Sequence, residues 1–112
     1  MDNRPIGVFD SGIGGLTVLK EINRLLPQES VVYFGDSGRA PYGTKSKETV
    51  IKYTFQDIRF LQNQDVKMIV IACNTASACS LDLVKHSFDF PIVEVVGPGA
   101  AAAAKATVNN RV

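Results

Sequence analysis

Residues 68–72 read MIVIA, an uninterrupted apolar run within a chain of 112 residues. Such a run is typical of a strand that is buried on both faces of a parallel sheet. The next segment, CNTASACSLDLVKHSF at 73–88, has the pattern of a helix with Asn74 or Thr75 as its N-cap. The sequence therefore predicts a strand that passes directly into a helix, with Cys73 at the junction.

Strand-like and helix-like segments alternate along the rest of the chain. Short apolar runs predict strands at 5–9, 31–35 and 91–96. Helical spacing or propensity predicts helices at 14–26, at 46–63 with Ser46 as N-cap, and at 97–108. This order predicts an α/β fold, an open parallel sheet of four strands with helices on both faces.

The bulk composition is that of an ordinary globular domain, 46% hydrophobic and 21% charged, with a net charge of +1. Near-neutral charge gives no electrostatic reason to expect nucleic acid or a membrane surface as a partner. The N-terminus lacks the basic and apolar regions of a signal peptide, so we expect a cytoplasmic location with Cys73 and Cys79 as thiols. Their C-x5-C spacing, with His86 downstream, fits no common zinc pattern, and we expect no metal site.

A glycine-rich stretch, FDSGIGGLT at 9–17, joins the first predicted strand to the first predicted helix. A dinucleotide fingerprint needs a glycine where Thr17 stands, and a phosphate loop needs a lysine that this stretch lacks. Asp10 would also repel a phosphate group. Two interpretations stay open, a tight turn that needs glycine for its backbone conformation and a loop that holds a small ligand.

Polar residues follow several of the predicted strands. Asp10-Ser11 and Asp36-Ser37 repeat the same pair after the first and second strands. In an open parallel sheet, ligands bind beyond the carboxyl ends of the strands, near the point where the strand order reverses. We therefore expect a small-molecule site at the edge that carries these two pairs together with 73–75 and Glu94.

Cys73 is the candidate acid/base or nucleophilic group at this edge. It would sit just before a helix N-terminus, where unpaired amides and the helix dipole stabilise a thiolate. A small hydrophobic residue that ends a strand is an equally good interpretation of its position. Cys79, six residues further along the same predicted helix, is expected to pack in the core.

The loop at 36–45 offers further candidates. Arg39 is expected either to clamp a carboxylate or to remain solvated. Tyr42 and Gly43 precede a predicted helix start, so backbone amides or the Tyr42 phenol would be available to an anionic ligand group. His86 lies late in its predicted helix, where a solvated cation suits the helix dipole.

Three motifs together resemble the glutamate racemases of the aspartate/glutamate racemase superfamily. They are GVFDSGIGGLTVL at 7–19, YFGDSGRAPYG at 33–43 and IVIACNTASA at 69–78. The resemblance implies cofactor-independent, two-thiol conversion of L-glutamate to D-glutamate for peptidoglycan synthesis. It also implies that Cys73 and Asp10 are catalytic. The substrate contacts that it implies are Asp10, Ser11, Tyr42, Gly43, Asn74 and Thr75.

The superfamily pattern also implies two similar α/β domains, each a flavodoxin-like half, with the second thiol in the other half. We therefore expect residues 1–112 to be an incomplete N-terminal α/β domain, with the second domain absent from the chain. We expect this chain alone to be inactive and its uncovered apolar surface to favour a homodimer. The alternatives are a racemase for aspartate or another amino acid, or a small flavodoxin-like domain that binds phosphate or flavin.

Overall fold

The computed structural model describes residues 3–11, 15–39 and 41–94. The predicted helix at 97–108 lies outside these residues, as does the end of the strand predicted at 91–96. The described strands are β1 (Ile6–Asp10), β2 (Val31–Gly35), β3 (Met68–Ile71) and β4 (Ile92–Glu94). The helices are α1 (Gly15–Leu25), α2 (Lys47–Gln62) and α3 (Asn74–Ser87), with 3₁₀ turns η1 (Ser37–Arg39) and η2 (Tyr42–Thr44).

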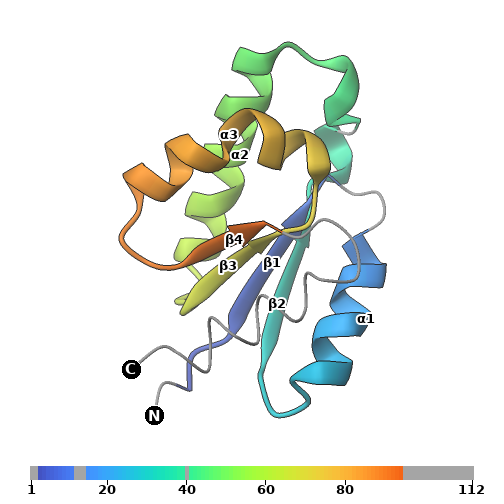
Figure 1. Cartoon of the computed structure of the whole chain (residues 1–112), viewed down its shortest axis with the longest axis vertical. Coiled ribbons are helices and arrows are strands. Elements are labelled where there is room, and N and C mark those ends of the chain that lie inside the picture. The colour runs from blue at the N-terminus through green and yellow to red at the C-terminus, as the bar shows by residue number, and fades with distance from the viewer. Residues whose placement is uncertain (1–2, 12–14, 40, 95–112) are drawn as a thin grey trace.

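The four strands form one sheet in the order β2-β1-β3-β4, and every pairing is parallel (Figure 1). The chain moves outward from β1 to β2, then returns past β1 to β3, so the strand order reverses between β1 and β3. This pair of central strands is the switch point at which an open α/β sheet binds ligands. The predicted fold class is confirmed.

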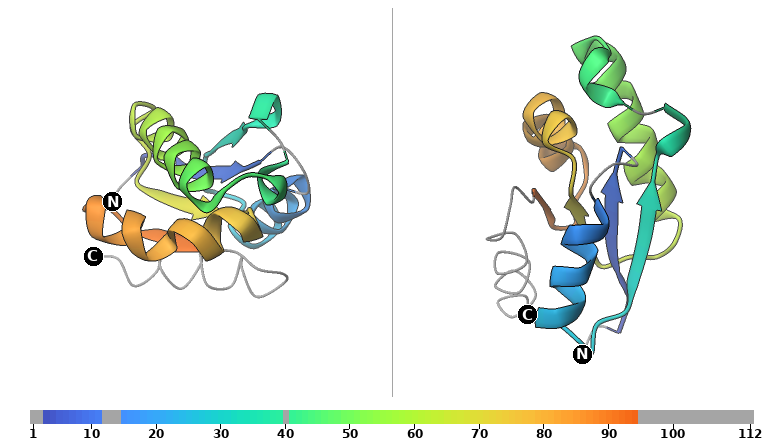
Figure 2. Two further views of the ribbon diagram at one scale, coloured as in Figure 1. Left: turned by 90° about the horizontal axis from the view of Figure 1, so that it is seen from above. Right: turned by 90° about the vertical axis from the view of Figure 1, so that its right-hand side faces the viewer.

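Alternation along β1 and β3 produces two separate cores, one on each face of the sheet. On one face, strand side chains pack against α1 and the residue that follows it. The strand residues are Ile6, Val8, Met68 and Val70, and they contact Ile22 and Leu26. The opposite face packs with α2 and α3 through Phe9, Ile69 and Ile71 against Val50, Ile58, Leu61, Ala76 and Val84. Helices α2 and α3 also pack against each other (Figure 2). With α1 on one face and α2 and α3 on the other, helices cover both faces of the sheet as expected.

Both longer helices begin at a side-chain cap. Ser46 precedes α2 in an extended conformation, and its hydroxyl accepts the Thr49 N–H at 3.1 Å, as the sequence predicts. The cap of α3 is Cys73, so the prediction of Asn74 or Thr75 is wrong. Cys73 is the last residue with extended backbone (φ −108°, ψ 119°), and Asn74 is already the first helical residue. A cysteine escaped the prediction because sulfur is a weak acceptor and is not among the preferred cap residues.

No helix among residues 3–11, 15–39 and 41–94 is long and apolar enough to span a membrane.

Candidate functional site

The carboxyl ends of the two central strands bring the aspartate and cysteine motifs together. Phe9 pairs with Ile71, and the Ala72 N–H donates to the Phe9 carbonyl at 2.8 Å. Continuing this register by one residue places Asp10 beside Ala72, one residue before Cys73. Two motifs that are more than sixty residues apart in the sequence therefore meet at the switch point of the sheet.

Cys73 occupies the entrance to α3 and is nearly buried, at 8% exposure. Its Sγ accepts the Ala76 N–H at 3.5 Å, so the sulfur takes the place of the usual cap oxygen. The unpaired amides of the first helical turn point toward this position, where they stabilise negative charge. The Cys73 sulfur is thus held at a helix N-terminus, among backbone N–H donors.

The first turn of α3 lies next to the turn η2. Asn74 is exposed and Thr75 is half-buried, as expected of residues that border an open edge. A Cβ atom built on Gly43 would lie 3.7 Å from the Thr75 Oγ1, which places η2 against this turn. The structure thus brings Gly43 to the same edge as the predicted contacts Asn74 and Thr75.

Asp10 is fully buried at the end of β1 and accepts a hydrogen bond that the sequence analysis did not foresee. The Tyr33 hydroxyl donates to the Asp10 Oδ1 at 3.0 Å. Burial, followed by this hydrogen bond, raises the pKa of Tyr33 to about 12, so the phenol keeps its proton and remains a donor. Ser11 beside it is also buried, at 7% exposure.

Gly35 makes room for this pair. It is the partner of Asp10 in the β1–β2 register, and a Cβ there would lie 3.0 Å from the Tyr33 hydroxyl and 3.3 Å from Asp10 Oδ1. The stretch VVYFG at 31–35 indicates part of this arrangement, because strand side chains alternate between faces and Tyr33 and Gly35 therefore lie on the same face of the sheet. Only the strand register shows that Asp10 lies on that face too.

The Tyr42 side chain is held inside the protein. Its ring is 1% exposed, and its hydroxyl contacts carboxylate oxygens of both Asp36 and Asp57. The sequence left open whether the phenol or the backbone amides of this turn would meet a ligand. Since the phenol is engaged with two carboxylates, the backbone amides are the groups to consider.

Arg39 also binds carboxylates of the protein itself. It pairs with Asp36 at 2.9 Å and with Asp57 at 3.2 Å, and its guanidinium lies 3.9 Å from the centre of the Tyr53 ring. Neither interpretation of Arg39 described this arrangement, in which the guanidinium pairs with two carboxylates of the chain itself. Asp57 was missed, although α2 periodicity puts position 57 on the buried face.

The second aspartate-serine pair and Glu94 have different surroundings from the first pair. Asp36 is buried against Arg39 and Tyr42, whereas Ser37 is exposed. Glu94 is exposed at the end of the edge strand β4. The edge is therefore built around Asp10-Ser11 and 73–75, with η2 beside them.

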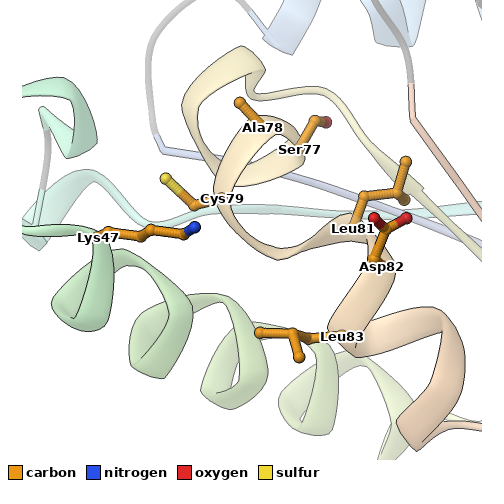
Figure 3. Close-up of a pocket in the computed structure, with 7 residues that line it drawn as sticks. All are labelled: Lys47, Ser77, Ala78, Cys79, Leu81, Asp82 and Leu83. Atoms are coloured by element: carbon orange, nitrogen blue, oxygen red, sulfur yellow. The ribbon is translucent and has the colours of Figure 1, made fainter.

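A separate pocket of about 430 Å³ lies between the start of α2 and α3. It is lined by Lys47 and by six residues of α3 from Ser77 to Leu83, none of them a predicted substrate contact (Figure 3). The Lys47 and Cys79 side chains extend toward one another in this pocket. Cys79 packs against the core as predicted but keeps part of its surface exposed.

His86 is exposed near the end of α3, as the sequence predicts. Within the described part of the chain, no three His, Cys, Asp or Glu side chains gather in a way that would hold a metal ion.

Curated relatives match the chain from end to end. It is 53% identical over 112 residues to the glutamate racemase of Lactococcus lactis and 55% identical over 112 residues to that of Streptococcus sanguinis. Over its whole length, this chain is homologous to glutamate racemases. It spans about two-fifths of the length of these relatives, 41% and 42% respectively. No family model matches the sequence.

Solved glutamate racemase structures share the fold. The Thermus thermophilus enzyme, determined in complex with β-chloro-D-alanine, is 50% identical with a TM-score of 0.81 and aligns with 90% of this chain and 40% of its own. The Francisella tularensis enzyme, determined in complex with D-glutamate, is 41% identical with a TM-score of 0.79. That alignment covers 98% of this chain and 50% of the other. The homology therefore extends to the arrangement of strands and helices around the candidate site.

Proposed function

We propose that this chain supplies one side of the active site of a glutamate racemase, with Cys73 as an acid/base group. The observation that carries the proposal is the Cys73 sulfur at the N-terminus of α3, which follows β3, the strand paired with the β1 strand that ends at Asp10. The homology to glutamate racemases supports glutamate as the substrate. The reaction provides D-glutamate for peptidoglycan, and the free thiols of Cys73 and Cys79 suit a cytoplasmic enzyme.

Racemisation removes the α-proton from one face of the substrate and delivers a proton to the other face. The Cys73 thiolate takes the proton in one direction of the reaction, and the Cys73 thiol returns it in the other. The carbanion formed between these steps needs hydrogen-bond donors around the α-carboxylate. We infer that the amides that open α3 and the side chains of Asn74 and Thr75 supply these donors.

Asp10 is proposed to bind the substrate ammonium group and to orient the Cys73 thiol. Since the Tyr33 hydroxyl donates to Oδ1, that oxygen acts as an acceptor, which suits a carboxylate that faces a cation. Pairing with the ammonium group would neutralise the buried Asp10 carboxylate when substrate binds. The side chain of Ser11 and the backbone of the Tyr42–Gly43 turn complete this side of the site.

Two faces of one carbon need two acid/base groups. Cys79 does not fulfil the second role, because it lies further along the same helix as Cys73, in the pocket between α2 and α3. We propose that the second thiol comes from a second α/β domain, with the substrate held between the two domains. The 112-residue chain alone is then expected to bind glutamate weakly and not to racemise it.

The test is a chimera in which this chain replaces the matching part of the Streptococcus sanguinis glutamate racemase. We expect the chimera to interconvert L- and D-glutamate, followed by circular dichroism, and not to act on aspartate. Cys73→Ser should lower the rate by a factor of about 10²–10⁴, the usual contribution of a general acid/base group. Cys79→Ser, a thiol of the same helix, should leave the rate unchanged.

Solvent deuterium gives a second measurement on the same variants. With one thiol per face, Cys73→Ser should stop α-proton exchange of one glutamate enantiomer much more than of the other. Equal exchange of both enantiomers, or full activity of Cys73→Ser, would contradict the role proposed for Cys73. Turnover of D-glutamate by the 112-residue chain alone would contradict the need for a second domain.

A further inference from the structure

Two aspartates share one tyrosine and one arginine beneath the loop at 36–44. The Tyr42 hydroxyl contacts Oδ2 of Asp36 and Oδ2 of Asp57, which come from the end of β2 and from the middle of α2. Arg39 pairs with Asp36 through Nε at 2.9 Å and with Asp57 through a terminal nitrogen at 3.2 Å. The four side chains form a single network, which we call the carboxyl cluster.

If both aspartates are ionised, the carboxyl cluster has too few hydrogen atoms to make a hydrogen bond at each of the two Tyr42 contacts. The Tyr42 hydroxyl has one hydrogen, and burial keeps it in place by raising the pKa of the phenol. The hydroxyl donates this hydrogen to one of the two carboxylates. Its contact with the second carboxylate then brings two acceptor oxygens together, unless that second carboxyl group carries a proton and donates it to the Tyr42 oxygen. Two buried carboxylates beside one guanidinium would also leave a net negative charge.

The geometry assigns this extra proton to Asp57. Its side chain is 1% exposed against 9% for Asp36, and its contact with Arg39 is the longer of the two. The pKa of Asp57 is raised to about 7, chiefly by burial and also by the nearby Asp36 carboxylate, while Tyr42 and Arg39 act in the opposite direction. The buried residues of the adjacent helix α3 carry no charge, since they are Ala76, Ser77, Ser80 and Val84.

The carboxyl cluster is connected to the candidate site through η2. Tyr42 belongs to the same buried core as Cys73 and Ala76. The next residue, Gly43, lies against Thr75, at 3.7 Å for a Cβ built on Gly43. A shift of the Tyr42 ring would therefore move the turn that borders the first helical turn of α3.

We propose that Asp57 is a positioning residue, whose proton holds Tyr42 between two carboxyl groups and so keeps the Tyr42–Gly43 turn against Thr75. Loss of that proton places two carboxylates on one hydroxyl, and their repulsion loosens the turn. The effect on substrate rests on the function proposed above, whereas the effect on the turn does not. The turn is therefore tested first, in the absence of substrate.

The experiment is a pH titration of the 112-residue chain by NMR, with labelled aspartate carboxyl carbons and backbone amides. We expect the Asp57 carboxyl to titrate with a midpoint near pH 7, and the Gly43 and Thr75 amides to follow with the same midpoint. In Asp57→Asn these two amides should no longer respond in this range. Asp82→Asn, which removes an exposed carboxyl group on α3, should leave their response unchanged.

Two results would overturn the positioning role. One is an Asp57 carboxyl that stays ionised down to about pH 4, and the other is an Asp57 that titrates near 7 without any response at Gly43 and Thr75. The amides of α1, on the opposite face of the sheet, are the control, because a shift with the same midpoint there would mean that the whole chain responds to pH. If Asp57→Asn does not fold, the agreement of the carboxyl and amide midpoints in the unsubstituted chain still decides the question.

The chimera extends the test to substrate. The KM for glutamate should rise several-fold as pH passes through 7, and Asp57→Asn should remove this rise while leaving kcat close to that of the unsubstituted chimera. An Asp57→Asn chimera with the unsubstituted pH profile would overturn the link to substrate. A chimera that lacks racemase activity, with Gly43 and Thr75 still following Asp57, would refute the proposed function and leave the positioning role standing.

Discussion

The sequence Asp-Ser-Gly occurs after both β1 and β2, yet the two aspartates have different surroundings. Asp10 follows Phe9 directly, lies at the switch point of the sheet and accepts one hydrogen bond from Tyr33. Asp36 follows the edge strand β2, and it shares Tyr42 and Arg39 with a second carboxyl group. Each aspartate is buried against a tyrosine hydroxyl, on opposite faces of the sheet.

One inserted glycine accounts for the difference. The first motif reads FDSG and the second FGDSG, so Gly35 moves the second aspartate by one residue. Because strand side chains alternate between faces, a shift of one residue sends Asp36 toward α2, whereas Asp10 lies on the face covered by α1. Gly35 itself occupies the position opposite Asp10 and leaves space for the Asp10–Tyr33 hydrogen bond.

The comparison shows that local sequence does not decide the role of an aspartate here. Asp10 sits fully buried where the central strand β1 ends, at the edge of the sheet that carries the candidate site. Asp36 sits at an edge strand whose following loop folds back over α2, and there it stabilises the loop. Residues of the same type at the ends of two neighbouring strands therefore lie in the candidate site in one case and in a structural network in the other.

The largest expected effect concerns the proton of the carboxyl cluster. The pKa of Asp57 is raised from an ordinary 3.8 to about 7, so the folded chain keeps a proton that the unfolded chain releases. The stabilisation from this proton is fully present below pH 4 and is lost as pH rises through 7. At 1.36 kcal/mol per pH unit, this amounts to roughly 4 kcal/mol between pH 4 and pH 8.

Urea unfolding of the unsubstituted chain and of Asp57→Asn at both pH values measures this loss. All other titrating groups are common to the two proteins, so they cancel in the difference of the free energies of unfolding. A difference that does not change with pH would show that Asp57 holds no extra proton.

The two tyrosines offer the next test. Tyr42→Phe removes a hydroxyl that serves two buried carboxyl groups, and we expect a cost of about 2–3 kcal/mol in the free energy of unfolding. Tyr33→Phe removes one hydrogen bond to Asp10, and we expect about 1 kcal/mol. Equal costs at pH 6, measured by urea unfolding, would contradict the difference between the two aspartates.

An effect between those of the two tyrosine variants is expected at Gly35. Gly35→Ala places a Cβ within 3.3 Å of both partners of the Asp10–Tyr33 hydrogen bond, and we expect a loss of about 1–2 kcal/mol. Gly38→Ala is the matched control, because a Cβ there meets nothing within 4 Å. Thermal unfolding of both variants checks this, and an unaffected Gly35→Ala protein would show that the space beside Asp10 is not required.

The sequence predicted the fold well because its signals are local and mutually consistent. The apolar run at 68–71 and the alternation of strands with helices specify a parallel sheet, and Ser46 marks the start of α2 correctly. The expectation that the motifs of Asp10 and Cys73 lie at one edge of the sheet followed from a general property of parallel sheets, that all strands end at one edge. It required no knowledge of individual contacts.

Two of the features that escaped prediction, Asp57 and Tyr33, depend on contacts between distant segments. Asp57 is an acidic residue on the buried side of α2, and only its position beneath the loop shows that Tyr42 and Arg39 satisfy it. Tyr33 is a typical strand residue whose partner depends on the register with β1. The thiol cap of α3 was missed because cap preferences are those of oxygen side chains.

The sequence by itself determined the α/β class, the order of the elements and the edge at which the chemistry lies. These follow from hydrophobic periodicity and turn residues, which act over a few neighbouring positions. The tertiary structure decided which FDSG-like motif faces the site, which tyrosine holds which aspartate, and where a proton is shared. These outcomes depend on burial and on the distances between residues that folding brings together. In a closely packed interior, the absence of a Cβ at Gly35 or the presence of one proton on Asp57 decides which contacts can form.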